Sequence, residues 1–258
     1  MPETTFSPTL LDTVRDARHI VVLTGAGVSA ESGIPTFRQA QTGIWAKYDP
    51  QELATPAAFR RNPRLVWRWY QWRRELVSGA HPNPAHYALA AMEQRADRFT
   101  LVTQNVDGLH RQAGSHNIIE LHGNLTRNKC FEHGHPVADG VDITSDDPEE
   151  PPRCPQCDSL LRPDVVWFGE ALPASAIESA FSAAQDAAVF FAIGTSAVVH
   201  PAASLPLVAL ENGALAVEVN PQETSLSPRV DYAFRQPAGK LLPDLLLALW
   251  PDATISGV

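Results

Sequence analysis

Three features of the sequence could do chemistry. Gly25, Gly27 and Ala30 have the spacing GxGxxA, which fits a tight turn whose backbone amides approach a pyrophosphate at a helix N-terminus. His122 follows the apolar run NIIEL, and an imidazole can take a proton from a hydroxyl group at physiological pH. Arg73 is the only charge on an apolar helical stripe, where a guanidinium needs a partner.

Each feature also has a purely structural explanation. The glycines could serve an ordinary strand-to-helix turn, a lone histidine is often a satisfied core or surface residue, and Arg73 could pair with a neighbouring carboxylate or extend into solvent. In an ordinary dehydrogenase, an acidic residue would follow the glycines by about 20 residues, at the end of the next strand. No strand pattern precedes Asp49 in GIWAKYDPQEL, so the dehydrogenase interpretation is weak.

The functional residues must be positioned by the elements that precede them. Helical patterns separate most of the short apolar runs, including residues 83–95, where Asn83 can serve as the N-cap and Pro84 as the first helical residue. This alternation predicts an α/β fold with a doubly wound, Rossmann-like parallel sheet, whose ligands bind beyond the carboxyl ends of the strands. The expected strands are 19–27, 99–107, 117–123, 188–196 and 215–221.

Two stretches interrupt the alternation. Residues 45–80 hold four tryptophans on helical patterns, and residues 126–163 are rich in Pro, Asp and Cys, with an exposed loop expected at 146–152. We interpret them as a helical insertion and a cysteine-bearing insertion that together form a small lobe. The expected Rossmann-like domain then comprises residues 1–44, 81–125 and 164–258.

The helix expected at 63–76 carries the arginine stripe. Its members recur at i, i+3, i+4, i+7, i+10 and i+11, the spacing of one helical face. On such a face, the planar guanidinium of an arginine can receive a carboxylate in two parallel hydrogen bonds. The stripe consists of Val66, Trp69, Tyr70, Arg73, Leu76 and Val77.

Composition narrows the class of function. The net charge of −9 disfavours sequence-independent nucleic-acid binding and suits a basic peptide substrate. Apolar stretches such as 187–193 are far shorter than the roughly 20 residues that span a bilayer, and no secretory signal is recognisable. We therefore expect a soluble, cytoplasmic protein, a monomer, that contacts neither nucleic acid nor membrane. Three cysteines clustered between Cys130 and Cys157 point to a metal site rather than to disulfides.

Taken together, the motifs resemble those of the sirtuin family. The segment GAGVSAESGIPTFR at 25–38 resembles the family's NAD-binding signature, and five further motifs follow in the family's order and roughly its spacing. Six ordered motifs are much more specific than any one of them, and the resemblance covers nearly the entire chain. The five are TQNVDGLH at 103–110, ELHG at 120–123, WFGE at 167–170, GTS at 194–196 and VNP at 219–221.

The resemblance implies catalytic roles for a few residues. His122 corresponds to the family's catalytic base. Asn105 and Asp107 would shape the nicotinamide pocket and position the water and the ribose, and Gln104 would contact the ribose. Asn and Asp also form turns well, so a purely structural role in the loop is the alternative for these positions.

The resemblance further implies contacts with NAD. Arg38 would help to hold the cofactor, and Phe37 would shield the reactive sugar carbon once nicotinamide leaves. The remaining implied contacts are Gly25, Ala26, Gly27, Ala30, Pro35, Trp45, Gly194, Thr195, Ser196, Asn220, Pro221, Gln222 and Ala238.

Substrate contacts follow from the same resemblance. Tyr70 and Arg73 match the Tyr-x-x-Arg pair of a bacterial sirtuin subgroup, in which these residues bind the terminal carboxylate of succinyl- or malonyl-lysine. The acylated peptide would enter between the lobes as an extended strand and pair with backbone around residues 195–199 and beside a second segment. That segment consists of Val166, Trp167, Phe168 and Gly169.

The family typically holds a structural Zn²⁺ with two CxxC pairs, so the insertion 126–163 resembles a zinc ribbon. The second pair is present as Cys154 and Cys157, whereas the first reads Cys130-x-x-His133, with His135 also within reach. Histidine can replace cysteine in a tetrahedral zinc site, and spacing favours His133 as the fourth ligand. The alternative is that the metal has been lost and that the lobe holds without it.

The reaction implied is NAD-dependent deacylation of protein lysine. In it the acyl oxygen attacks the nicotinamide ribose, nicotinamide leaves, His122 activates a ribose hydroxyl, and water yields free lysine and O-acyl-ADP-ribose. Two other functions stay open: an NAD hydrolase or ADP-ribosyltransferase, and a non-catalytic NAD or ADP-ribose sensor. Retention of WFGE argues against the first, and retention of His122 and Asn105 argues against the second.

Overall fold

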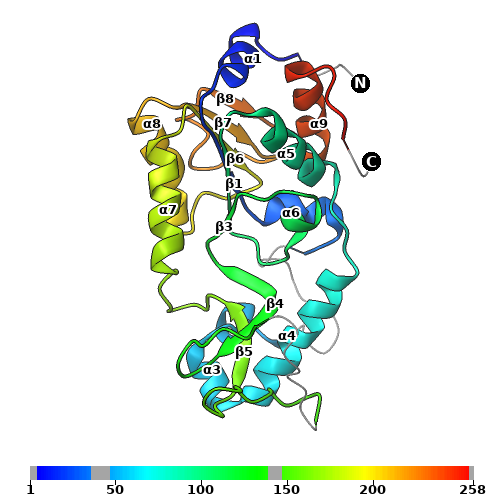
Figure 1. Ribbon diagram of the computed structural model, residues 1–258, viewed down its shortest axis with the longest axis vertical. Helices are drawn as coiled ribbons and strands as arrows, with labels where there is room; N and C mark the ends of the chain where they lie inside the picture. The colour runs from blue at the N-terminus through cyan, green and yellow to red at the C-terminus, as the bar shows by residue number, and fades with distance from the viewer. Residues whose placement is uncertain (1–4, 36–46, 139–146, 256–258) are drawn as a thin grey trace.

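The computed structural model describes residues 5–35, 47–138 and 147–255. Their main element is a six-stranded sheet of order β3-β2-β1-β6-β7-β8, in which all neighbouring strands are parallel (Figure 1). The strand order reverses between β1 and β6, as in a doubly wound Rossmann fold, which confirms the expected fold class. The strands are β1 (Ile20–Thr24), β2 (Phe99–Thr103), β3 (Ile118–Glu120), β6 (Val189–Ile193), β7 (Leu215–Val219) and β8 (Tyr232–Phe234).

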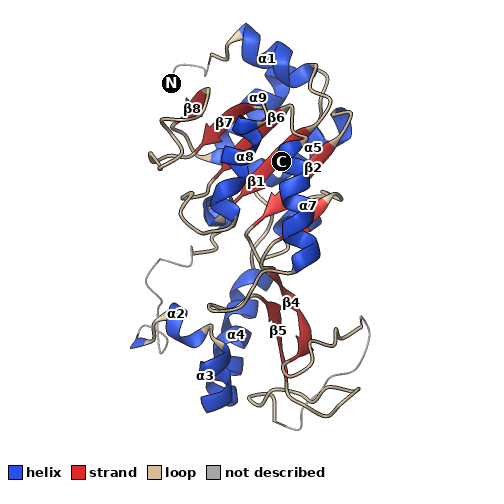
Figure 2. Cartoon of the chain, turned by 90° about the vertical axis from the view of Figure 1, so that its left-hand side faces the viewer, coloured by secondary structure: helices blue, strands red, loops and turns tan. Residues whose placement is uncertain are grey.

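Helices cover both faces of this sheet (Figure 2). On one face α1, α5 and α9 pack against Ile20 and Val22 of β1, and on the other α7 and α8 pack against Val21 and Leu23. Because both faces are buried, the central strands are continuous apolar runs. The helices are α1 (Pro8–Arg15), α5 (Pro84–Arg95), α7 (Ala174–Gln185), α8 (Leu205–Glu211) and α9 (Ala238–Leu249).

The sequence predicted most of these elements. All five expected strands are present, and the helix expected at 83–95 is α5, whose N-cap Asn83 accepts a hydrogen bond from the Ala85 amide at 2.9 Å. Strand β8 was missed because it is three residues long and none of them is fully buried. Short helices follow three of the strands at the carboxyl edge, namely η1 (Ala26–Ser32), α6 (Leu109–Gln112) and η3 (Ala202–Ser204).

A smaller lobe lies below the sheet in Figure 1. Its helices pack on an antiparallel pair of strands around an aromatic core that includes Phe59, Trp69 and Trp167. It draws on both stretches that interrupt the strand–helix alternation, although the boundary residues themselves stay a prediction. The elements are α2 (Pro50–Leu53), α3 (Pro56–Arg61), α4 (Pro63–Ser78), β4 (Gly123–Cys130) and β5 (Leu161–Val165).

Two expectations for this lobe need correction. On the α4 stripe, Val66, Trp69, Tyr70 and Val77 are buried and Arg73 is half-buried, but Leu76 is 41% exposed because Val77 makes the core contacts of the last turn. The loop expected to be exposed at 146–152 is described from residue 147 on, and this part is partly covered. Pro151 and Pro152 are buried, and Asp147, Glu149 and Glu150 pair with arginines of α4.

None of the helices in the described part of the chain is both long and apolar enough to cross a membrane.

The close packing at Gly123, where the two lobes join, predicts that Gly→Ala lowers the free energy of unfolding more there than at Gly213. Gly123 and Gly213 both have positive φ, at 77° and 86°, but a Cβ at Gly123 would lie 2.1 Å from the Asp164 carbonyl oxygen, whereas nothing lies within 4 Å at Gly213. Gly213→Ala should therefore lower the free energy of unfolding by only roughly 1–2 kcal/mol, the strain of a left-handed backbone conformation in a residue with a Cβ. Gly123→Ala should cost roughly 3 kcal/mol or more, because β5 must also move. Urea unfolding measures both, and equal destabilisation would contradict the close approach.

Candidate active site

Two glycine loops interlock where the strand order reverses. The Gly25 amide donates to the Ile193 carbonyl at 3.0 Å, and the Gly27 amide donates to the Gly194 carbonyl at 2.8 Å. A Cβ on Gly27 would lie 2.7 Å from the Gly194 Cα, and one on Gly194 would lie 2.4 Å from the Val28 nitrogen. Both positions therefore require glycine. The turn expected from GxGxxA is present, with a 3₁₀ helix following it.

Polar side chains from the neighbouring strand ends converge on these loops. Gln104 Nε2 donates to Thr195 Oγ1 at 3.0 Å, and Asn220 Nδ2 donates to the Thr195 carbonyl at 2.8 Å. Asn105 Nδ2 donates to the Gly25 carbonyl at 3.2 Å. Residues that follow β1, β2, β6 and β7 thus meet at one edge of the sheet, which is where a doubly wound fold binds its ligand.

Asp107 is buried and anchored from two sides. Its Oδ2 accepts from Ser29 Oγ at 2.8 Å and its Oδ1 from the Leu109 amide at 2.9 Å, while burial raises the pKa of the carboxyl group. Ser29 Oγ also accepts from Asn105 Nδ2 at 3.1 Å and lies 3.4 Å from His86 Nε2. Sequence reasoning missed the roles of Ser29 and His86. Ser29 lies inside the GAGVSAES motif, so its position could have flagged it, whereas His86 looks like an ordinary residue of α5.

His122 lies two residues after the end of β3, immediately before β4, and is largely buried. Its Nδ1 is 2.9 Å from the Gln104 carbonyl oxygen, and because a carbonyl can only accept, Nδ1 carries the proton. Nε2 is then the unprotonated nitrogen. Burial lowers the pKa of His122 below its usual value, which outweighs the opposite effect of the Gln104 hydrogen bond. At pH 7 the ring is therefore a neutral imidazole with Nε2 available as a base.

The other expected cofactor contacts are placed as follows. Phe37, Arg38 and Trp45 lie outside the described residues. Thr195 is buried, and Ala238 is buried as the first residue of α9. The exposed members of the set are Ala26, Ala30, Pro35, Ser196, Pro221 and Gln222.

The expected acyl-binding residues lie against the segment that follows β5. Trp167 Nε1 donates to the Tyr70 hydroxyl at 2.8 Å, and the Val166 amide donates to the His122 carbonyl at 2.9 Å. The Arg73 guanidinium lies 5.1 Å from the centre of the Trp69 ring, and burial lowers its pKa. The structure therefore places Tyr70 against Trp167 of the WFGE segment, and the backbone of the neighbouring Val166 is hydrogen-bonded to that of His122.

Four side chains in the small lobe form a cluster suited to a metal ion. The ligand atoms of Cys130, Cys154, Cys157 and His135 all lie within 4.8 Å of one another. Cys130 Sγ is 3.5 Å from Cys157 Sγ, and Cys154 Sγ is 3.7 Å from His135 Nδ1. Ligands about 2.3 Å from a tetrahedral Zn²⁺ are separated by roughly 3.7 Å, so this Cys₃His set fits zinc.

The prediction of His133 as the fourth ligand was wrong. Gly134 has a positive φ of 67°, and the chain turns back so that the Cys130 amide donates to the His135 carbonyl at 2.8 Å. This hairpin brings the imidazole of His135 to the thiols. His133 is exposed and contributes only its backbone amide, which lies 3.4 Å from Cys130 Sγ.

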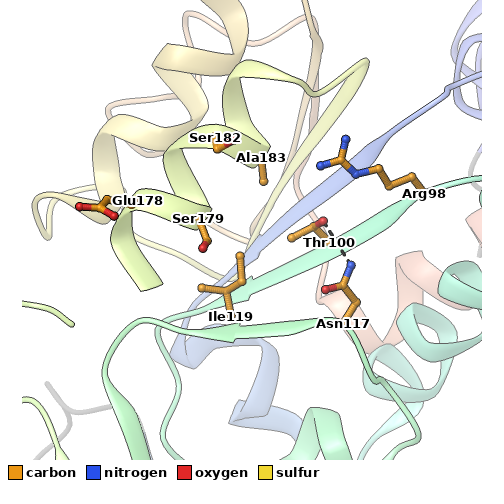
Figure 3. Close-up of a pocket in the computed structure, with 8 residues that line it drawn as sticks. All are labelled: Arg98, Thr100, Asn117, Ile119, Glu178, Ser179, Ser182 and Ala183. Atoms are coloured by element: carbon orange, nitrogen blue, oxygen red, sulfur yellow. Dashed lines mark hydrogen bonds between the residues drawn. The ribbon is translucent and has the colours of Figure 1, made fainter. Parts of the chain in front are cut away.

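A separate hollow of about 490 Å³ lies near the amino ends of β2 and β3, beside α7 (Figure 3). Arg98, Thr100 and Asn117 line one side, and Glu178 and Ser179 of α7 line the other. Arg98 is paired with Asp186 at 3.0 Å. None of the expected functional residues lines this hollow, and it lies away from the carboxyl edge of the sheet, so we do not assign the active site to it.

The fold and the residues at its carboxyl edge define a two-lobed, Rossmann-like protein with interlocked glycine loops and a neutral histidine. The sequence model of the Sir2 family matches residues 25–201, and the chain belongs to this family. The family expected from the motifs is thereby confirmed.

The chain is similar to proteins named NAD-dependent protein deacylase. One from Aquifex aeolicus is 53% identical over 220 residues, covering 85% of this chain and 90% of that protein. One from Methylococcus capsulatus is 52% identical over 251 residues, covering 95% of this chain and 97% of that protein. Among solved structures, a Sir2 homologue in complex with NAD has a TM-score of 0.86 at 45% identity, with 96% of both chains covered. A Sir2 protein with a deacetylated p53 peptide and 3′-O-acetyl ADP-ribose has a TM-score of 0.80 at 33% identity, and the match covers 93% of this chain and 97% of that chain.

The metal cluster predicts that replacing His135 weakens zinc binding, whereas replacing the neighbouring His133 does not. His135→Ala should lower zinc affinity by at least about 10-fold, since losing a ligand costs no less than losing an outer-shell partner, and it should lower the unfolding temperature. His133→Ala is the matched control and should change neither. Zinc content after dialysis against a chelator series and thermal unfolding measure both effects. Loss of zinc from the His133 variant alone would restore the assignment based on spacing.

Proposed function

We propose that this protein is an NAD-dependent deacylase of protein lysine side chains that releases nicotinamide and O-acyl-ADP-ribose. One observation carries the proposal: His122 is held as a neutral imidazole, with its proton on Nδ1, by the Gln104 carbonyl oxygen at 2.9 Å. The Gln104 side chain in turn bonds Thr195 beside the glycine loops. A base is thereby oriented beside the glycine loops, at the edge of the sheet where this fold binds its ligand. The names of the homologues support the same activity.

In the proposed mechanism NAD supplies the bond between nicotinamide and ribose that the reaction breaks. His122 Nε2 takes the proton of a ribose hydroxyl, and the hydrogen bond to Gln104 keeps the ring from rotating. Asn105 and Asp107 shape the nicotinamide pocket and position the attacking water, with Ser29 bridging the two side chains. The proposed contacts with the rest of the dinucleotide are Gly25, Ala26, Gly27, Ala30, Gly194, Thr195, Ser196, Asn220, Pro221, Gln222 and Ala238.

We propose that the acylated peptide docks as an extended strand between residues 166–169 and 195–199. Phe168 is 47% exposed, and Val198 and Val199 are 50% and 43% exposed, so both segments present apolar side chains to solvent. An extended peptide can cover such side chains while its backbone forms strand-like hydrogen bonds. The zinc cluster would have a structural role, because it ties the 130–135 hairpin to the 154–157 turn.

We further propose that the acyl group carries a carboxylate, as in succinyl- or malonyl-lysine. Tyr70 packs in the aromatic core beside Trp167, and the Arg73 guanidinium lies over the Trp69 ring of the same core. Burial raises the pKa of Tyr70 to about 12, so its hydroxyl stays protonated and can donate. A phenol and a guanidinium are both hydrogen-bond donors, a combination that suits a carboxylate.

The role of His122 is tested by replacing it. His122→Ala should lower deacylation by at least about 100-fold, because general base catalysis typically contributes that much, while the thermal unfolding curve stays similar. The measurement follows nicotinamide release together with peptide mass for acetyl-, succinyl- and malonyl-lysine peptides. His116→Ala, an exposed histidine outside the site, is the matched control and should retain activity.

The result for the unaltered protein separates the proposal from its alternatives. NAD loss without peptide deacylation would indicate an NAD hydrolase, and no turnover of any kind would indicate a sensor. Substantial deacylation by the His122 variant would remove the histidine from the mechanism.

The acyl preference is tested on α4. Arg73→Met should lower kcat/KM for succinyl-lysine by about 10- to 100-fold more than for acetyl-lysine, since a hydrogen bond to a charged group contributes roughly 1.5–3 kcal/mol. Arg68→Met is the matched control, because Arg68 lies on the same helix but is exposed and pairs with Glu149 at 3.2 Å. Equal losses on both peptides would make Arg73 a structural residue.

A further inference from the structure

Trp167 and Tyr70 form a buried pair that joins two distant parts of the chain. The indole Nε1 is 2.8 Å from the phenol oxygen, and the two rings are stacked with their planes 24° apart. Trp167 is 1% exposed and Tyr70 is 3% exposed. The hydrogen bond is thus shielded from water and has a fixed geometry.

The direction of this hydrogen bond follows from chemistry alone. An indole N–H can only donate, so the oxygen of Tyr70 must accept. The indole hydrogen of Trp167 occupies one side of the Tyr70 oxygen. The hydroxyl proton of Tyr70 must therefore point away from Trp167. Burial raises the pKa of Tyr70 to about 12, so this proton is retained at neutral pH. The phenol is left with a donor whose direction is set by Trp167.

Trp167 is itself held by a buried arginine. The Arg162 guanidinium lies over the indole ring, 3.2 Å from its centre, and the Arg162 residue is 2% exposed. Arg162 donates to both carboxylate oxygens of Glu170 and to the Val165 carbonyl. Glu170 also accepts from the Trp167 backbone amide at 2.8 Å. One ion pair therefore fixes both the backbone and the ring of Trp167.

The segment that carries Trp167 is tied to both lobes. The Val166 amide donates to the carbonyl of His122 and the Phe168 amide donates to the carbonyl of Ala54, each at 2.9 Å. The indole therefore cannot move relative to His122 or to the small lobe without breaking backbone hydrogen bonds.

We propose that Trp167 is a positioning residue for acyl selectivity: its indole N–H aims the Tyr70 hydroxyl proton at the carboxylate of a succinyl or malonyl group. Arg162 and Glu170 hold the indole in place for this purpose. The inference rests on the proposed acyl preference and assigns it a further determinant outside the Tyr-x-x-Arg pair. Acetyl-lysine has no carboxylate to receive the proton, so the arrangement discriminates between acyl groups.

The test compares Trp167→Phe with Trp67→Phe. Trp67 is also buried, but its Nε1 has no hydrogen-bond partner among the described residues, which makes it a matched control. We expect Trp167→Phe to lower the ratio of succinyl to acetyl kcat/KM by about 5-fold, the effect of one misdirected hydrogen bond. Trp67→Phe should leave this ratio unchanged. In a Tyr70→Phe background, Trp167→Phe should lower the ratio no further, since the two act through one hydroxyl.

A second measurement does not depend on activity or on the Trp167 variant being folded. The ¹⁵N-indole NMR signal of Trp167, assigned by elimination with the other Trp→Phe variants, should shift and exchange faster with solvent in Tyr70→Phe. An unchanged signal, or additive effects of Trp167→Phe and Tyr70→Phe on the ratio, would overturn the inference while leaving the acyl preference intact. If the unaltered protein does not hydrolyse succinyl- or malonyl-lysine, the acyl preference fails and the inference fails with it.

Discussion

The close approach of two backbone loops at the centre of the sheet governs the rest of the site. Gly27 and Gly194 are so near that a methyl group on either would overlap main-chain atoms of the other loop. Because no side chain stands between them, the loops bond to each other through their backbones, and the polar groups of Gln104, Asn105 and Thr195 meet beside them. The parallel strands β1 and β6 create this meeting point, since the crossover connections leave in opposite directions there.

A buried polar network, whose histidines are uncharged, lies next to these loops. Thr24 Oγ1 lies 2.9 Å from both Thr103 Oγ1 and His110 Nε2, and the His86 and His110 rings are 4.7 Å apart. Burial lowers the pKa of His86 to about 4 and that of His110 well below its usual value, so both rings are neutral. A neutral network avoids the desolvation cost of buried ions while still orienting Ser29, which bonds Asp107 and Asn105.

The sequence predicted the layout of the fold well because parallel strands buried on both faces leave an unmistakable apolar run, and because each run ends at a chemically distinctive motif. It failed where geometry depends on residues far apart or on a single turn. His133 was preferred over His135 because spacing cannot reveal the hairpin that Gly134 makes, and β8 is too short to leave a pattern. The Trp167–Tyr70 hydrogen bond joins residues 97 positions apart, which no local pattern encodes.

That long separation has a consequence for how the chain is made. As the chain leaves the ribosome, α4 appears early, yet Trp69 and Tyr70 gain their cover only after β5 and Trp167 have been synthesised. At about 5–20 residues per second, this aromatic face stays uncovered for several seconds. Contacts between distant positions also form slowly. The small lobe therefore completes its packing only after the β1–β2 half of the sheet has been synthesised.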